Sequence, residues 1–174
     1  APLCASPAFN DGALCVGATD SFEAKAWYSN LTVKPDLLAV AAPGGQGALL
    51  CEEDVVSTVP PGTETVCGDD TVGYDYYAGT SMAAPHVSGV AALLSAQGRT
   101  NAQIYDVLTS TARMPLTGAR GVYDPAYGYG IVDAAAAVAT STGSGTAEPP
   151  ADEKPKGGSN ARGGGPKKDK KQPR

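Results

Sequence analysis

A serine at position 81 stands among small residues where an extended segment is expected to turn into a helix. Residues 79–89 read GTSMAAPHVSG. The N–H groups of a first helical turn lack intrahelical partners and carry partial positive charge, which suits a developing oxyanion. Gly79 permits a sharp turn, and Pro85 is expected within the first turn, where its missing N–H costs little. The pattern predicts a nucleophilic Ser81 whose own N–H is an oxyanion donor; the alternative is a serine that only caps a buried helix.

This segment resembles the nucleophile motif of the subtilisin-like serine proteases, the subtilases. Besides Ser81, the positions that carry the resemblance are Gly79, Thr80, Met82, Pro85 and His86. Further blocks follow the family's order: VGATD (16–20), AVAAPG (39–44) and STVP (57–60) before the motif, and GYGIVDA (128–134) after it. The resemblance covers about residues 1–139. It implies an α/β fold, a partial subtilisin-like fold with a mostly parallel sheet flanked by helices, and a serine endopeptidase acting on polypeptides through an acyl-enzyme.

The general base that a serine hydroxyl needs is not evident in this sequence. The chain has one histidine, His86, five residues after Ser81 and therefore about 140° around a helix. In subtilases the histidine at this place is not the catalytic base, so we expect His86 to be a packed, hydrogen-bonded helix residue. No segment resembles those that carry the triad Asp, the triad His or the oxyanion Asn. We therefore expect the chain as given to be inactive; the alternative is a non-catalytic binding module derived from a subtilase.

The first residues of the chain resemble the stretch that follows the oxyanion Asn in subtilases. We therefore expect a fragment, the C-terminal portion of a catalytic domain. The helix expected over residues 81–96 is apolar on nearly every side, as in a helix covered all round. The other elements of the chain are too few to cover it, so we expect a preceding half of the protein to do so.

Short apolar runs and capping signals predict the remaining elements. Thr100 and Gln103 form a capping box before a helix that runs to about Arg113, and Asp133 is expected to cap a last helix over 134–139. Strands are expected at residues 13–18, 37–42, 55–59, 74–78 and 127–131.

Composition divides the chain into a catalytic-domain portion, residues 1–139, and a Gly/Pro/Lys-rich tail, residues 140–174, expected to be disordered. The tail holds eight of the thirteen basic and four of the eighteen acidic residues, which leaves five and fourteen in the first part. An acidic body argues against nucleic acid as its partner. The tail is expected to be a solvated linker, with contact to an anionic surface as the alternative. No apolar run is long enough to cross a membrane.

Four cysteines stand at positions 4, 15, 51 and 67, without the spacing of a zinc site. We expect a secreted protein with two disulfides, Cys4–Cys15 and Cys51–Cys67, because each pairing closes a short loop. The alternative is four buried free thiols.

No cofactor is required by the expected chemistry. Acidic side chains could ligate calcium in the full-length protein, as subtilases often do, but solvated acidic loops are the expected interpretation. These side chains are Glu52, Glu53, Asp54, Asp69, Asp70 and Asp75. Three tyrosines just before the nucleophile, Tyr74, Tyr76 and Tyr77, are expected to pack on their strand, with substrate contact as the alternative.

Overall fold

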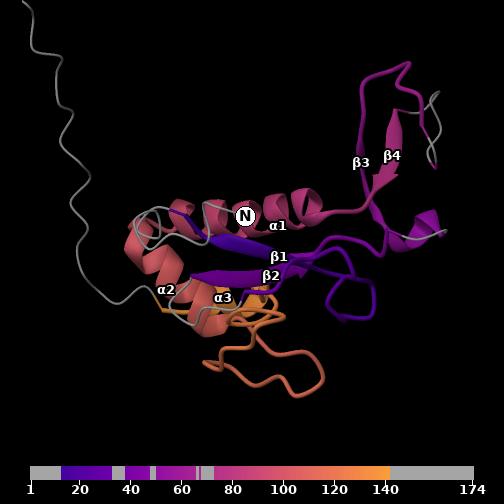
Figure 1. Cartoon of the computed structure of the whole chain (residues 1–174). Helices are drawn as coiled ribbons and strands as arrows, with labels where there is room; N and C mark the ends of the chain where they lie inside the picture. Colours follow the sequence, from indigo (N-terminus) through magenta and orange to yellow (C-terminus); the bar gives the residue numbers. More distant parts are fainter. Residues whose placement is uncertain (1–12, 33–37, 48–49, 66, 68–72, 142–174) are drawn as a thin grey trace, which may run out of the picture.

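Two parallel strands beneath a long helix form the centre of the protein (Figure 1). A computed structural model describes residues 13–32, 38–47, 50–65, 67 and 73–141. Strand β1 (Cys15–Thr19) pairs in parallel with β2 (Ala39–Pro43), in the register Cys15↔Ala39 to Thr19↔Pro43. Both strands consist of small or β-branched residues without a charge, as expected of strands buried on both faces.

The long helix α1 (Thr80–Ala96) packs on these strands through one stripe of its surface. The buried residues of the stripe follow helical spacing: Ala83, Val87, Val90 and Leu94. They meet small strand residues such as Ala18 and Ala42, which let the helix approach closely. Helices α2 (Asn101–Thr111) and α3 (Ala134–Ala139) complete this core.

The capping signals are confirmed. The Thr100 side chain accepts the Gln103 N–H, and the Gln103 side chain accepts the Thr100 N–H at 2.9 Å, which closes the predicted capping box of α2. Asp133 accepts the Ala136 N–H at 2.9 Å and so begins α3. These bonds satisfy amides that the helices themselves leave open.

The strand predicted over residues 127–131 is wrong. The segment forms isolated bridges instead, with Ile131 between Ala41 of β2 and Arg113. The reason is local backbone geometry, because Gly128 has φ 63° and Gly130 has φ 121°, values that interrupt an extended strand. The segment still extends the sheet edge, since Tyr129 N–H donates to Ala39 at 2.8 Å.

A separate antiparallel ribbon, β3 (Val55–Thr58) with β4 (Tyr74–Tyr77), projects away from the core (Figure 1). The short 3-10 helix η2 (Cys51–Glu53) precedes it. The predicted disulfide Cys51–Cys67 is confirmed, and the loop that it closes contains β3. For the other predicted pair, Cys15 is buried in β1 and Cys4 lies outside the described residues.

The α/β class is confirmed, but α1 is not covered on every side by the part of the chain that the structure describes. Its outward side is solvent-exposed, and Leu93 keeps 54% of its surface in water. Among the described helices, none has both the length and the apolar character needed to cross a bilayer. The predicted tail lies outside the described residues, apart from positions 140 and 141.

Candidate active site

The turn that presents Ser81 lies between β4 and α1. Gly79 is the N-cap of α1, with φ 156° and ψ 163°. This region of backbone conformation is essentially restricted to glycine. A Cβ there would have room, its nearest neighbour being the Met82 sulfur at 3.6 Å. The sequence therefore needs Gly79 for the direction of the turn rather than for lack of space.

Ser81 is the second residue of α1, and it is exposed. The Gly79 carbonyl accepts the next two amides, from Met82 at 3.0 Å and Ala83 at 3.3 Å. Within the described residues, no backbone carbonyl accepts the Ser81 N–H. A hydroxyl and an uncommitted amide thus stand together at the positive end of a seventeen-residue helix. This arrangement can bind an anionic oxygen beside a nucleophile.

Pro85 lies further into the helix than predicted, because α1 already begins at Thr80. Pro85 is the sixth helical residue and has no N–H to donate to the Ser81 carbonyl. The position is exposed, so water can solvate this carbonyl.

His86 is hydrogen-bonded, as predicted, but it is not packed. Its Nδ1 lies 2.8 Å from the Met82 carbonyl of its own helix, and the ring is exposed. The prediction of packing is wrong for the described residues because His86 lies on the outward side of α1. Among the hydrogen bonds of the described residues, none joins the His86 ring to Ser81, so His86 is not placed as the base of Ser81.

An aromatic pair that the sequence analysis missed lies behind the nucleophile turn. The Tyr28 hydroxyl lies 2.6 Å from the carbonyl oxygens of both Gly44 and Gly45, in the loop that follows β2. The Trp27 indole N–H donates to the next carbonyl, that of Gln46, at 3.1 Å. Residues 39–44 belong to a block that resembles the subtilases, but no periodicity in the sequence links this block to residues 27 and 28.

The tyrosines of β4 lie on the other side of the turn. Tyr74 and Tyr77 are 50% and 40% exposed, and Tyr76 is half-buried. Partial desolvation raises the pKa of Tyr77, and the neighbouring Asp75 carboxylate raises it further. Tyr74 and Tyr77 are therefore not buried by strand packing.

No group of three or more metal-ligating side chains occurs among the described residues. Of the acidic residues weighed for calcium, Asp69 and Asp70 lie outside them. Asp54 uses Oδ1 to accept the Gly47 N–H at 2.8 Å, and Asp75 uses Oδ1 to accept the Tyr76 N–H at 2.8 Å.

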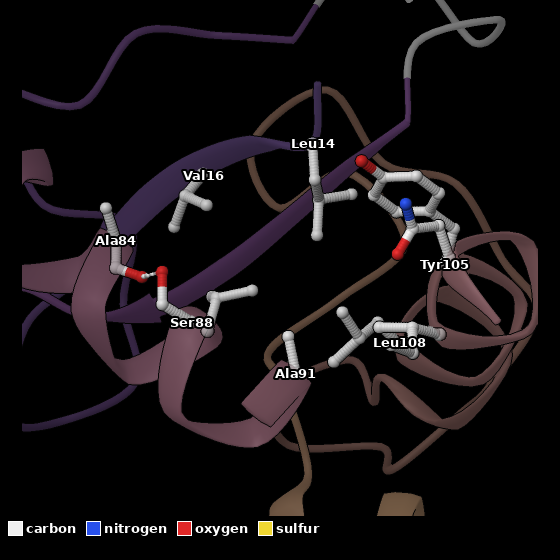
Figure 2. Close-up of a pocket in the computed structure, with 10 residues that line it drawn as sticks. Leu14, Val16, Ala84, Ser88, Ala91, Tyr105 and Leu108 are labelled. Atoms are coloured by element: carbon white, nitrogen blue, oxygen red, sulfur yellow. Dashed lines mark hydrogen bonds between the residues drawn. The ribbon is translucent and has the colours of Figure 1, made fainter. Parts of the chain in front are cut away.

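An open cavity of about 330 Å³ lies between β1, α1 and α2, away from the nucleophile turn. Figure 2 shows Leu14 and Val16 facing α1 across it, with Tyr105 and Leu108 on the α2 side. Of residues 79–89, Ala84, Val87 and Ser88 line it, and Ser81 does not. Most of the residues that line it are apolar.

Comparison with known proteins places the chain. The subtilase family (Peptidase_S8) matches residues 4–130. A thermophilic serine proteinase of Bacillus sp. (strain AK1) is 38% identical over 106 residues, which are 61% of this chain and 21% of that protein. An extracellular protease of Xanthomonas campestris pv. campestris is 38% identical over 136 residues, 76% of this chain and 20% of that protein.

A solved structure, of a lanthipeptide protease, superposes with a TM-score of 0.57 at 29% identity, covering 72% of this chain and 40% of its own. The chain thus spans about a fifth of the length of the two curated relatives. The family match covers well over half of the chain. The chain therefore belongs to the subtilase family.

Proposed function

We propose that residues 79–89 are the nucleophile segment of an exported subtilisin-like serine endopeptidase, with Ser81 as the acylating residue. The observation that carries the proposal is the exposed Ser81 beside its own uncommitted N–H, at the start of α1, in a chain of the subtilase family. Export is supported by the Cys51–Cys67 disulfide and by the extracellular protease among the relatives. Substrates would be unfolded or flexible polypeptides, whose segments can enter an active site in extended form.

In the proposed reaction, Ser81 Oγ attacks the scissile carbonyl while a general base takes its proton. The carbonyl oxygen becomes negative and accepts the Ser81 N–H. The scissile C–N bond then breaks and the amine leaves with the proton from the base, which gives the acyl-enzyme. Water hydrolyses this ester, releases the carboxylic acid product and returns the proton to Ser81 Oγ. The base and its carboxylate would come from parts of the complete protein outside this chain, because the one histidine here follows Ser81 by five residues and lies about 140° around the same helix. The proposed reaction requires no cofactor.

The uncovered surfaces support a larger catalytic domain. Among the described residues, β1 has a strand partner on one side only; on its other side Ala18 is hydrogen-bonded to Ser29 and Ala26, so the open part of that edge is the start of the strand, at Val16. An uncharged free edge is a site of unwanted pairing that folded proteins normally cover. A preceding strand along β1 would also close the cavity of Figure 2 at Leu14 and Val16.

The proposal is tested by comparing peptide hydrolysis by the complete protein and by residues 1–174. We expect the complete protein to cleave a chromogenic peptide and residues 1–174 to show no comparable rate, because loss of the base removes most serine activation. Ser81→Ala should abolish cleavage in the complete protein.

The matched control is Ser110→Ala, which removes a hydroxyl from α2; this hydroxyl donates to the Val107 carbonyl at 3.4 Å. It should retain activity. A folded complete protein without peptidase activity would contradict the proposal and favour a non-catalytic binding module.

A further inference from the structure

Three consecutive carbonyl groups of the loop after β2 receive side-chain donors from two adjacent aromatic residues. Tyr28 Oη lies 2.6 Å from the Gly44 and the Gly45 oxygen, and Trp27 Nε1 lies 3.1 Å from the Gln46 oxygen. The two rings meet edge to face with centroids 5.7 Å apart. The aromatic pair therefore fixes both the position and the peptide orientation of this loop.

The same loop holds the nucleophile turn. The Gly44 carbonyl, besides meeting Tyr28, accepts the Gly79 N–H at 2.8 Å. Gly79 lies two residues before Ser81 and has the glycine-restricted conformation that sets the direction of α1. One carbonyl oxygen thus joins the Tyr28 hydroxyl to the backbone that presents the nucleophile.

The loop after β2 is closely packed between Tyr28 and the nucleophile turn. A Cβ at Gly44 would lie 2.8 Å from the Gly79 oxygen, and a Cβ at Gly47 would lie 3.2 Å from the Tyr28 ring and 3.3 Å from Ala78 Cβ. The loop is therefore enclosed between the ring and the turn at van der Waals distance. A shift of the ring or of its hydroxyl would be passed to the turn.

The Tyr28 hydroxyl stays protonated at neutral pH and can therefore donate a hydrogen bond. Burial is the main cause that raises the pKa of its hydroxyl, while the nearby Gly79 backbone lowers it less, and the Asp54 and Asp20 carboxylates raise it further. The protonated hydroxyl can donate to Gly44 or Gly45, and the Gly79 N–H donates to the Gly44 carbonyl.

We propose that Tyr28 is a positioning residue for Ser81, acting through the Gly44 carbonyl and the Gly79 amide. The inference rests on the proposed peptidase function and adds to it a group that does not touch the substrate. Its effect is on the placement of Ser81 Oγ and of the Ser81 N–H. A displacement of an ångström or less at a reacting group is enough to slow the chemical step severely.

The test is Tyr28→Phe in the complete protein, a change that keeps the ring and removes only the hydroxyl. We expect kcat to fall about tenfold with KM unchanged, and the rate of Ser81 labelling by a fluorophosphonate to fall by a similar factor. Amide hydrogen exchange in residues 78–82 should become faster, because the Gly79 N–H loses a fixed acceptor.

The matched control is Tyr123→Phe, which removes another tyrosine hydroxyl that donates to a backbone carbonyl, that of Thr32 at 3.0 Å. It should leave kcat, labelling and exchange in residues 78–82 as in the wild type. Wild-type values for Tyr28→Phe, or an equal loss in both variants, would overturn the inference. If the wild-type complete protein neither cleaves nor labels, the proposed function fails, and the exchange of residues 78–82 alone decides whether Tyr28 positions the turn.

Discussion

The amide of Gly79 donates to the carbonyl of Gly44 at 2.8 Å and so ties the nucleophile turn to the carboxyl end of β2. The bond joins two glycines that the sequence shows only as parts of separate motifs. It places the start of α1 against the most buried part of the fold, since the β2 residues just before Pro43 are fully buried. Ser81 is thereby exposed while its backbone is anchored.

Replacing Gly79 by alanine should impair the reaction more than the fold. The residue has a glycine-restricted conformation but free space around its Cβ position, so the expected cost is backbone strain of about 1–3 kcal/mol. The backbone would relieve this strain by changing the direction in which α1 begins, and Ser81 would move with it. We therefore expect the complete protein to cleave peptides at least about tenfold more slowly.

The control for this variant is Gly118→Ala, at a position that also has positive φ (67°) and where a Cβ would meet nothing within 4 Å. Alanine there should cost backbone strain of about 1 kcal/mol and leave the cleavage rate unchanged. Equal rates for both variants would mean that the conformation of Gly79 does not matter for the reaction.

Two glycines with almost the same backbone conformation separate strain from steric clash. Gly128 has φ 63° and Gly118 has φ 67°, but a Cβ would lie 2.2 Å from the Ala39 oxygen at the first and within 4 Å of nothing at the second. We expect Gly118→Ala to cost about 1 kcal/mol of unfolding free energy and Gly128→Ala more than about 3 kcal/mol. Urea unfolding of the complete protein in a Ser81→Ala background, which prevents self-cleavage, measures both, and similar losses would contradict this packing.

The backbone conformations of Gly128 and Gly130 also explain why the strand over residues 127–131 was mispredicted. The run around Tyr129 and Ile131 has the apolar character of a strand, and it does pair with β2. The sequence pattern did not show that Gly128 and Gly130 have positive φ. These values go with the close approach of β2 to Gly128 and of Arg113 to Gly130, not with a local preference of the sequence. The helices were predicted well because their caps, Thr100 and Asp133, are local signals.

An ion pair between Glu23 and Arg113 should make stability depend on pH in the acid range. Both terminal nitrogens of the Arg113 guanidinium donate to the Glu23 carboxylate, Nη1 at 2.9 Å. These bonds are the main cause that holds the pKa of Glu23 below its ordinary value of 4.5. A lowered pKa in the folded state stabilises the protein above the unfolded pKa and loses this effect as the pH falls through the folded one.

We therefore expect Glu23→Gln to lower stability at pH 7 by less than about 1 kcal/mol, because both side chains are about a third or more exposed. The difference from the wild type should shrink as the pH falls below 4.5, the ordinary pKa of a glutamate. Urea midpoints at pH 7, 5 and 3 measure it, with the exposed Glu64→Gln as control. A difference that grows toward low pH would have the wrong sign.

Loss of the Cys51–Cys67 disulfide should loosen the β3–β4 ribbon. The bond closes a loop with a sequence separation of 16, for which a stabilisation of about 3 kcal/mol is typical. The double variant Cys51→Ser with Cys67→Ser should lower the urea midpoint and speed proteolysis between residues 55 and 77. If neither changes, the ribbon is held by its strand pairing alone.

The active-site turn was predicted in part. The nucleophile motif located Ser81 and the helix start because both depend on adjacent residues. The contribution of Tyr28 depends on hydrogen bonds to a loop 16 and 17 residues away, and such side chain–backbone contacts leave no periodic trace in a sequence. His86 was expected to be packed because the histidine at this place in subtilases is not the catalytic base; among the described residues its ring is exposed.

The central claim, that Ser81 is the nucleophile of a peptidase, is tested most directly by locating a covalent adduct. The complete protein is treated with a fluorophosphonate, digested, and the modified residue is identified by mass spectrometry. The account predicts one modified peptide with the adduct on Ser81, formed at a protease-like rate and lost after heat denaturation or in Ser81→Ala. Modification of another serine at that rate, or none at Ser81 in a folded protein, would contradict it.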